Sequence, residues 1–295
     1  MSKYKTDLLL LTSAIIWGFG FVAQRAGMQY IGPFTYNAIR FAMGGLFLIP
    51  IVLKKKVSVT TSAKVNLKYG IILGSVLFIA SSFQQVGLIY TTAGNAGFIT
   101  GIYVVIVPIL GMFIGRKTFK TTWIGAILAV SGLYFLSATE NISMNFGNLL
   151  VFVSSIIWAV HVLLIDNFAK KVEPIIIACI QFLVTSILCF MVMLFTETST
   201  WTAIYAALIP LVYGGLVSVG IGFTLQIIAQ KKAHPTHAAI ILSLEAVFAV
   251  TGGVLILKET LNLNTIVGCL LMLAGMMISQ LWKKNNMTDK EILNK

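Results

Sequence analysis

The sequence predicts an all-α integral membrane protein of ten transmembrane helices, built as two inverted five-helix repeats with both termini in the cytoplasm. Three observations predict this fold. First, 58% of the 295 residues are apolar and only 10% are charged, whereas soluble domains have about 45–50% apolar and about 25% charged residues. Second, apolar stretches of bilayer-crossing length follow one another along the chain. Third, rare residues recur at a nearly constant spacing between the two halves.

Short polar connectors separate ten apolar stretches, each near the length of about 20 residues that a helix needs to cross the hydrocarbon core. They cover residues 7–26, 34–53, 69–89, 94–115, 121–138, 147–167, 174–195, 206–229, 236–257 and 262–282. The first stretch is long for a secretory signal, carries Gln24 and Arg25 near its end and lacks a small-x-small cleavage pattern. We therefore expect it to remain as the first span.

The positive charges set the expected orientation. With the N-terminus in the cytoplasm, all but three of the 21 lysine and arginine residues fall on the cytoplasmic side; the exceptions are Arg25, Arg40 and Lys258. Cytoplasmic loops of membrane proteins carry this excess. The net charge of +12 is thus a topology signal and gives no support to nucleic-acid binding. We expect a multi-pass protein of the cell membrane whose partners are the lipid bilayer and a small-molecule substrate.

The two halves of the chain resemble each other. The motif Ser13-x-Ile15-Ile16-Trp17 recurs as Ser154-x-Ile156-Ile157-Trp158 at an offset of 141 residues. Further pairs, at offsets of 141 to 143, are Pro33 and Pro174, Phe41 and Phe182, Gln84 and Gln226, Ala96 and Ala238, and Gly125 and Gly268. The repeat divides the chain into residues 1–140 and residues 141–295, with five spans in each part.

Because five is an odd number, the second repeat must enter the membrane from the opposite side. The charges agree, since Arg116-Lys117 follows the fourth span while its counterpart Lys258-Glu259 is neutral overall. Inverted repeats are the hallmark of carriers that alternate access around a site at the membrane midplane. The alternative is an old duplication that is kept only for stability.

Several motifs carry a resemblance to a known family. They are Ser13–Gly20 with its Ile-Ile-Trp-Gly core, Pro33-Phe34 with Arg40-Phe41, Ala93–Tyr103 continuing to Pro108, and Ala238–Phe248 running to Lys258-Glu259-Thr260. In their order and spacing they resemble the EamA-type exporters of the drug/metabolite transporter superfamily. The resemblance implies a ten-helix basket with a central cavity and export of amino acids or other small metabolites. One departure is Glu245-Ala246, where many relatives carry a proline.

Glu245 is the first candidate for binding a substrate or a proton. It lies about nine residues into its span, near the expected midplane, where a charged side chain costs about 2.5–3.5 kcal/mol on insertion scales. His237 and Ile241 share its helical face because they precede it in steps of four residues. The alternative is a carboxylic acid that is held neutral, or paired with Arg40, for packing.

The repeat places an equivalent stripe in the fourth span. Asn95, Ile99 and Tyr103 correspond there to the stripe that ends at Glu245. Two such stripes that face each other would line a cavity. Pro108 lacks a backbone N–H and is expected to kink the same span.

His161 lies about midway along its span, one turn from Trp158. An imidazole at this depth would bind a carboxylate or relay a proton, and the alternative is a buried histidine with satisfied hydrogen bonds. His234 and His237 flank Pro235, but no third ligand is evident. We therefore expect neither a metal nor a cofactor.

A further set of polar and aromatic residues is placed so that it could face the same cavity. The members are Gln84, Gln226, Trp17, Phe21, Gln24 and Trp158. A buried amide needs partners or water, and aromatic walls suit an amphipathic substrate. The alternatives are helix-bridging glutamines and aromatic packing. Arg40 lies about 9 Å from the end of its span at 1.5 Å per residue, so we expect it to snorkel outward in a structural role.

These features predict a secondary transporter that exports a small polar or amphipathic metabolite, with protons as a possible coupling ion. Glu245 would hold an amine or a proton, and His161 a carboxylate. An alternative on the same fold is an efflux carrier for cationic drugs. A polytopic membrane enzyme is the remaining alternative, but the chain has no Gly-x-Ser-x-Gly or His-Glu-x-x-His motif. We therefore expect a protein that is not an enzyme.

Overall fold

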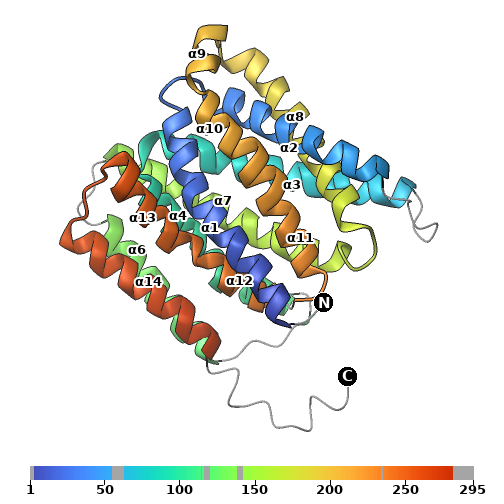
Figure 1. Ribbon diagram of the computed structural model, residues 1–295. Coiled ribbons are helices and arrows are strands. Elements are labelled where there is room, and N and C mark those ends of the chain that lie inside the picture. Colours follow the sequence, from blue (N-terminus) through green and yellow to red (C-terminus); the bar gives the residue numbers. More distant parts are fainter. Residues whose placement is uncertain are drawn as a thin grey trace, which may run out of the picture.

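The structure is a computed structural model that describes residues 3–54, 63–113, 115, 120–137, 142–233 and 235–281. Within these ranges the regular secondary structure is entirely helical. Long helices lie side by side across the molecule (Figure 1). The expected all-α fold is thereby confirmed.

Every one of the ten apolar stretches coincides with one or more helices. The helices are α1 (Lys3–Gly27), α2 (Pro33–Lys54), α3 (Ala63–Tyr90), α4 (Ala93–Gly101), α5 (Tyr103–Phe113), α6 (Lys120–Ser137), α7 (Ile142–Phe168), α8 (Pro174–Thr196), α9 (Trp201–Ala206), α10 (Leu208–Val212), the π-helix η1 (Tyr213–Phe223), α11 (Thr224–Gln230), α12 (Pro235–Ser243), α13 (Glu245–Leu257) and α14 (Leu263–Leu281).

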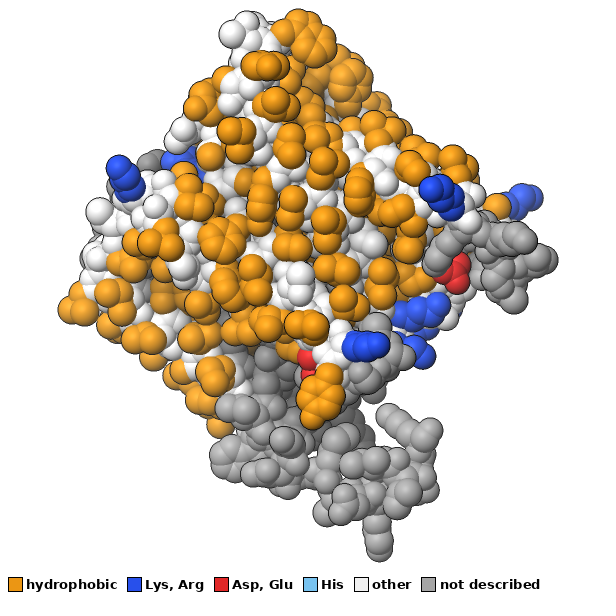
Figure 2. Space-filling model, viewed as in Figure 1, with side chains coloured by type: hydrophobic (Ala, Val, Ile, Leu, Met, Phe, Trp, Pro, Cys, Tyr) orange, Lys and Arg blue, Asp and Glu red, His pale blue; other side chains and the backbone are white. Residues whose placement is uncertain are grey.

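Among the described residues, seven helical segments are long and apolar enough to cross a membrane. They are α1, α2, α3, α4 with α5, α7, α8, and α10 with η1 and α11. The other three predicted spans contain shorter apolar helical stretches, Trp123–Gly132, Ile241–Leu257 and Ile266–Gly275. Hydrophobic side chains cover the middle of the visible face, whereas lysine and arginine side chains lie at its edges (Figure 2). The count of ten spans stays a prediction.

The helices begin where the local sequence favours a start. Pro33 and Pro174 are the first residues of α2 and α8, a position where the missing N–H has no partner to lose. Thr92 and Thr200 cap α4 and α9, because their side chains accept hydrogen bonds from the backbone N–H three residues ahead. The short helix α9 was not expected from the sequence, which shows only a polar connector before Trp201.

Helices of equivalent spans pack against each other across the two repeats in three pairs: α2 with α8, α4 with α13, and α6 with α14. Each pair meets at a glycine. A Cβ atom added to Gly45 would lie 2.7 Å from Cδ2 of Leu183, and one added to Gly132 would lie 2.6 Å from the backbone oxygen of Gly268. At Gly97 the added atom would collide with Cβ of Ala249. Small residues therefore set the close approach of the two repeats.

Two helices are interrupted at repeat-equivalent positions. The chain leaves the α-helix at Ile102, between α4 and α5, and at Leu244, between α12 and α13, 142 residues later. The N–H of Ile102 donates to the carbonyl of Ile99 at 3.2 Å, and the N–H of Leu244 donates to that of Ile241 at 3.3 Å. Both hydrogen bonds join residues three apart, as in a 3₁₀ turn, and not four apart as in an α-helix. A 3₁₀ turn within a helix often marks a hinge. Pro108 lies inside α5, six residues after the first of these interruptions.

The predicted span 206–229 is also not a regular α-helix, because its centre is the π-helix η1. Side chains of α1 bind the carbonyl groups of this wider helix. The hydroxyl of Ser13 donates to the carbonyl of Gly222 at 3.0 Å, and the indole N–H of Trp17 donates to that of Ser218 at 3.3 Å. In return, the Tyr213 hydroxyl donates to the carbonyl of Ile16 at 2.9 Å. The π-helix is therefore tied to α1 along its length.

Candidate functional site

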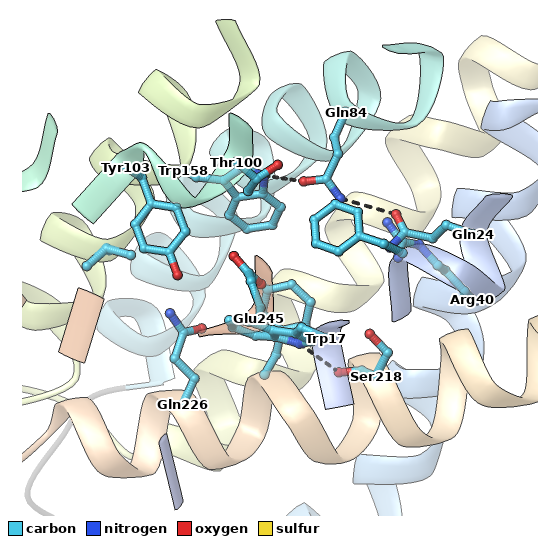
Figure 3. Close-up of a pocket in the computed structure, with 13 residues that line it drawn as sticks. Trp17, Gln24, Arg40, Gln84, Thr100, Tyr103, Trp158, Ser218, Gln226 and Glu245 are labelled. Carbon is cyan, nitrogen blue, oxygen red and sulfur yellow. Dashed lines mark hydrogen bonds between the residues drawn. The ribbon is translucent and has the colours of Figure 1, made fainter. Parts of the chain in front are cut away.

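A central cavity lies between the two repeats and is lined by side chains from both. Its walls come from α1, α2, α3, α4, α5, α7, η1, α11 and α13. The lining residues are Trp17, Phe21, Gln24, Arg40, Gln84, Thr100, Tyr103, Trp158, Val162, Ser218, Phe223, Gln226 and Glu245. Figure 3 shows their polar atoms and ring faces converging on one space.

Most of the residues that the sequence singles out lie at this cavity. They are Glu245, Tyr103, Gln84, Gln226, Trp17, Trp158, Phe21 and Gln24. Asn95 and His161 are buried but do not line it. The side chain of His237 lies outside the described residues, as does all of His234. The structure thus gathers side chains from both repeats, and their role in binding stays a prediction.

The two helix interruptions place Tyr103 and Glu245 opposite each other. Each is the first residue after its break, at the start of α5 and of α13, and each is only 3% exposed. The Tyr103 hydroxyl points toward the Glu245 carboxyl, with the amide of Gln226 beside them (Figure 3). Oε1 of Gln226 is buried and has no hydrogen-bond partner in the structure. Polar atoms that are buried and unpaired at a cavity are available to a ligand.

A short relay of hydrogen bonds runs along one wall. The indole N–H of Trp158 donates to Oε1 of Gln84 at 2.8 Å, and Nε2 of Gln84 donates to Oε1 of Gln24 at 3.2 Å. Nε2 of Gln24 then donates to the carbonyl of Gly20 at 3.1 Å. Because each amide has both a donor and an acceptor engaged, the relay fixes the orientation of three side chains at the cavity.

Aromatic rings form the opposite part of the wall. The ring centroids of Trp17 and Phe223 are 4.5 Å apart, and those of Trp158 and Phe223 are 5.7 Å apart. One tryptophan comes from each repeat, at the equivalent position of the shared Ile-Ile-Trp motif. The rings provide an apolar surface with a negative face that also attracts cations.

The expectation that Arg40 snorkels outward is wrong. Arg40 is 3% exposed and lines the cavity, because α2 directs this position into the bundle. Its Nε donates to Oδ1 of Asn37 at 2.9 Å, and its guanidinium carbon lies 4.7 Å from the centre of the Phe41 ring. Among the described residues no ion pair joins it to Glu245, so the suggested pairing of these two charges is not formed.

His161 lies behind the cavity wall. Trp158 and Val162, four residues apart, face the cavity, so that His161 points elsewhere by the rotation of about 100° per residue. Its Nε2 lies 3.1 Å from Oε1 of Gln181 on α8, and its ring meets that of Trp158 edge-on at 5.6 Å between centroids. We therefore correct its expected place at the substrate.

The expected straight stripe of Asn95, Ile99 and Tyr103 does not form either. The interruption at Ile102 changes the rotation between α4 and α5, and Thr100 faces the cavity together with Tyr103. Asn95 lies near the start of α4, where its N–H donates to the side chain of Thr92. The phase of a helical stripe holds only while the helix is continuous.

Sequence reasoning missed Thr100, Val162, Ser218 and Phe223 at the cavity. Val162 could have been found, since it follows Trp158 by four residues on one helix. The other three depend on the break at Ile102 and on the π-helix, and neither irregularity has a clear signal in the sequence. Together with Arg40 and Glu245 the full set offers one cationic group, one acidic group, amides and aromatic faces.

Comparisons with known proteins agree on one family. The sequence profile of the EamA-like transporter family matches residues 4–138 and again residues 145–280. A protein named as an uncharacterized transporter of Archaeoglobus fulgidus is 32% identical over 285 residues, which are 95% of this chain and 87% of that protein. The uncharacterized transporter YoaV of Bacillus subtilis is 23% identical, over 93% of this chain and 96% of its own.

A solved crystal structure has the same fold. It superposes with a TM-score of 0.73 at 20% sequence identity, covering 97% of this chain and 100% of that chain. At this identity the likeness shows the fold alone. The profile and the relatives nevertheless confirm the family that the sequence motifs indicate.

Proposed function

The chain belongs to the EamA-like transporter family, within the drug/metabolite transporter superfamily, and on that premise we propose that it is a secondary transporter that exports small polar or amphipathic metabolites such as amino acids. The family makes it a multi-pass membrane transporter. The proposal adds the substrate class, the direction and a mechanism in which the central cavity opens alternately to each side.

One observation carries the proposal: the two interrupted helices meet the cavity at equivalent points of the two repeats. Transporters with inverted repeats bind substrates at discontinuous helices near the membrane midplane. Tyr103 and Glu245 are the residues at these interruptions, and their side chains point toward each other at the cavity. An exchange of conformation between the two repeats would move both helices about this site.

In the proposed topology the protein lies in the cell membrane, crosses it ten times and has both termini in the cytoplasm. The distribution of lysine and arginine supports it. Exposed aromatic residues at the ends of α8 and α9, namely Phe195, Trp201 and Tyr205, are 88%, 86% and 77% exposed. They form the kind of aromatic belt that membrane proteins place at the bilayer interface.

Within the cavity, the two ionisable side chains of opposite charge suggest how a zwitterion would be held. Glu245 would bind an ammonium group or, between substrates, a coupling proton. Arg40 takes the part that the sequence suggested for His161 and would bind a carboxylate. Gln84 and Gln226 would complete the polar contacts, and the aromatic wall of Trp17 would cover the apolar part of the substrate.

The aromatic wall also supports a second candidate, the efflux of lipophilic cations. Trp17, Trp158 and Phe223 present ring faces to the same space as Glu245, and cations bind such faces. Arg40 distinguishes the two candidates, because a buried guanidinium disfavours a purely cationic ligand and favours one that also carries an anion.

Flux into and out of proteoliposomes tests both candidates. The purified protein would be assayed with a panel of amino acids, their decarboxylated amines and quaternary cations, with and without a pH gradient. If Glu245 binds the ammonium group, Glu245→Gln should raise KM by about 10- to 150-fold, because a hydrogen bond to a charged group contributes about 1.5–3 kcal/mol.

The matched control is Glu173→Gln, which removes an acid at the start of α8 that does not line the cavity. It should transport with the KM of the parent protein. Folded protein that moves none of the panel, or a Glu245→Gln variant with unchanged flux and an unchanged response to the pH gradient, would count against the proposal.

A further inference from the structure

At one end of the bundle, the carboxylate of Glu197 closes onto the start of α2. Glu197 follows the last residue of α8, and its Oε1 accepts the backbone N–H of Phe34 at 2.8 Å. Its Oε2 accepts the backbone N–H of Thr35 at 2.8 Å and the Thr35 hydroxyl at 2.7 Å. Gly32 leaves room for the carboxylate, since a Cβ atom there would collide with it.

A second carboxylate makes the same kind of contact with the start of α4. Oε1 of Glu259 accepts the backbone N–H of Ala93 at 2.7 Å, and its Oε2 accepts that of Gly94 at 3.1 Å. Lys258 adopts a left-handed conformation with φ of 55°, which turns the chain back so that Glu259 reaches α4. A Cβ atom on Gly253 would collide with Oε2 of Glu259, so this glycine also makes room for a carboxylate.

The two contacts, called here the acidic latches, share three properties. Each joins the start of a first-repeat helix, α2 or α4, to the end of a second-repeat helix from the equivalent span, α8 or α13. Each places a negative charge at a helix start, where the helix dipole and the free N–H groups stabilise it. Both lie at the same end of the bundle, since α2 and α4 run in the same direction between the same two faces in the proposed topology.

The sequence carries the opposite charge at the repeat counterparts of these two acids. The repeat counterpart of Glu197 is Lys56, at an offset of 141, and that of Glu259 is Lys117, at an offset of 142. A cation at a helix start is repelled by the dipole and cannot accept an N–H. Lys56 and Lys117 lie outside the described residues, and the sequence alone establishes the reversal of charge. The two repeats therefore differ in charge at these two positions.

We propose that the acidic latches are the gate of one side of the transporter and that they bias the resting protein toward closure on that side. The proposal rests on the transport function proposed above. In the proposed topology the latched end faces the outside, so that the empty carrier waits with its cavity available to the cytoplasm. Such a bias suits export, because the carrier then loads from the side on which the metabolite is made.

Labelling of a reporter cysteine in the cavity tests the gate without any substrate. Ser218→Cys places the reporter on the cavity wall, in a background where Cys179, Cys189 and Cys269 are replaced by alanine. A membrane-impermeant maleimide is added to intact cells and, separately, to inverted vesicles. The parent reporter protein should react slowly from the outside and faster from the cytoplasmic side.

Opening the latches should reverse this order. Each of Glu197→Gln and Glu259→Gln should speed outside labelling by about tenfold, because a charge-assisted hydrogen bond is lost in each case. Gly253→Ala provides a second route that keeps every charge, since its methyl group displaces the Glu259 carboxylate. Glu173→Gln is the matched control at the other end of α8, where the acid makes no cap hydrogen bond, and it should label at the parent rate.

Outside labelling that stays at the parent rate in both glutamine variants and in Gly253→Ala, with thermal unfolding showing folded protein, would overturn the gate. So would a parent protein that already labels rapidly from the outside. Variants that label faster than the parent protein only from the cytoplasmic side would overturn the assignment of the latched end to the outside. Because no outcome involves flux, a failure of the proposed transport function would be seen separately, in the proteoliposomes.

Discussion

Gln84 and Gln85 are neighbours on α3, yet the structure predicts opposite effects when each is replaced by leucine. Gln84 lines the cavity and makes two side-chain hydrogen bonds, with Trp158 and with Gln24. Gln85 is fully buried away from the cavity, and both polar atoms of its amide lack a hydrogen-bond partner in the structure. Leucine resembles glutamine in size, so the comparison isolates the polar contacts.

For Gln84→Leu the free energy of unfolding should fall. Interhelical hydrogen bonds in membrane proteins contribute about 0.6 kcal/mol on average and at most about 1.7 kcal/mol. The loss of two therefore costs about 1–3 kcal/mol. The change also removes the acceptor of the part-buried indole N–H of Trp158.

For Gln85→Leu the free energy of unfolding should stay the same or rise. A buried amide without partners carries a desolvation cost of about 1–3 kcal/mol, and leucine removes that cost while filling a similar volume. The two variants are thus predicted to change the free energy of unfolding in different directions. This prediction does not depend on the exact size of either change.

Unfolding of the purified protein in detergent, followed by tryptophan fluorescence and by circular dichroism, measures both effects. Flux in proteoliposomes adds a functional readout, because only Gln84→Leu alters the cavity. Equal destabilisation by both variants, or a loss of stability confined to Gln85→Leu, would refute the placement of these two side chains and the reasoning that follows from it.

Three further changes test other parts of the structure. Arg40→Gln should raise KM for amino acids by about 10- to 150-fold and leave KM for the decarboxylated amines unchanged; equal effects on both substrates would show that Arg40 does not bind a carboxylate. Gly18→Ala should destabilise the protein by about 1–3 kcal/mol, because the added Cβ would lie 2.8 Å from the backbone oxygen of Glu245, and a neutral result in thermal unfolding would contradict that packing. Lys258→Gly should stabilise the protein by up to about 1 kcal/mol, since its φ of 55° costs a residue with a side chain about that much; a lower melting temperature would contradict this account.

The cavity shows where reasoning from single helices works and where it fails. Trp17, Phe21 and Gln24 share one face of a continuous helix, and all three line the cavity as their spacing predicts. Asn95 and Tyr103 are also spaced by whole turns, but the break at Ile102 separates them. A stripe is a property of an unbroken helix, and the tight bonds that break α4 arise from packing that no local pattern reveals.

His161 and Arg40 illustrate the same limit for the direction of single side chains. The sequence places His161 near the membrane midplane, but only its contact with Gln181 on α8 shows that it faces away from the cavity. Arg40 is within reach of the bilayer interface by its position along α2, yet α2 turns it inward. Depth follows from counting residues, whereas direction depends on which face of the helix meets its neighbours.

By itself, the sequence determined that this protein is an all-helical membrane protein of two related halves, because composition, apolar length and repeat spacing are properties of the linear chain. Only the tertiary structure decided which polar residues share the cavity and that two acids hold the starts of α2 and α4. The physical reason is that contacts such as those of Glu197 with Thr35 and of Glu259 with Ala93 join residues more than 160 positions apart. Their existence depends on helix rotation, helix breaks and close packing, and these are settled only when the whole bundle is assembled.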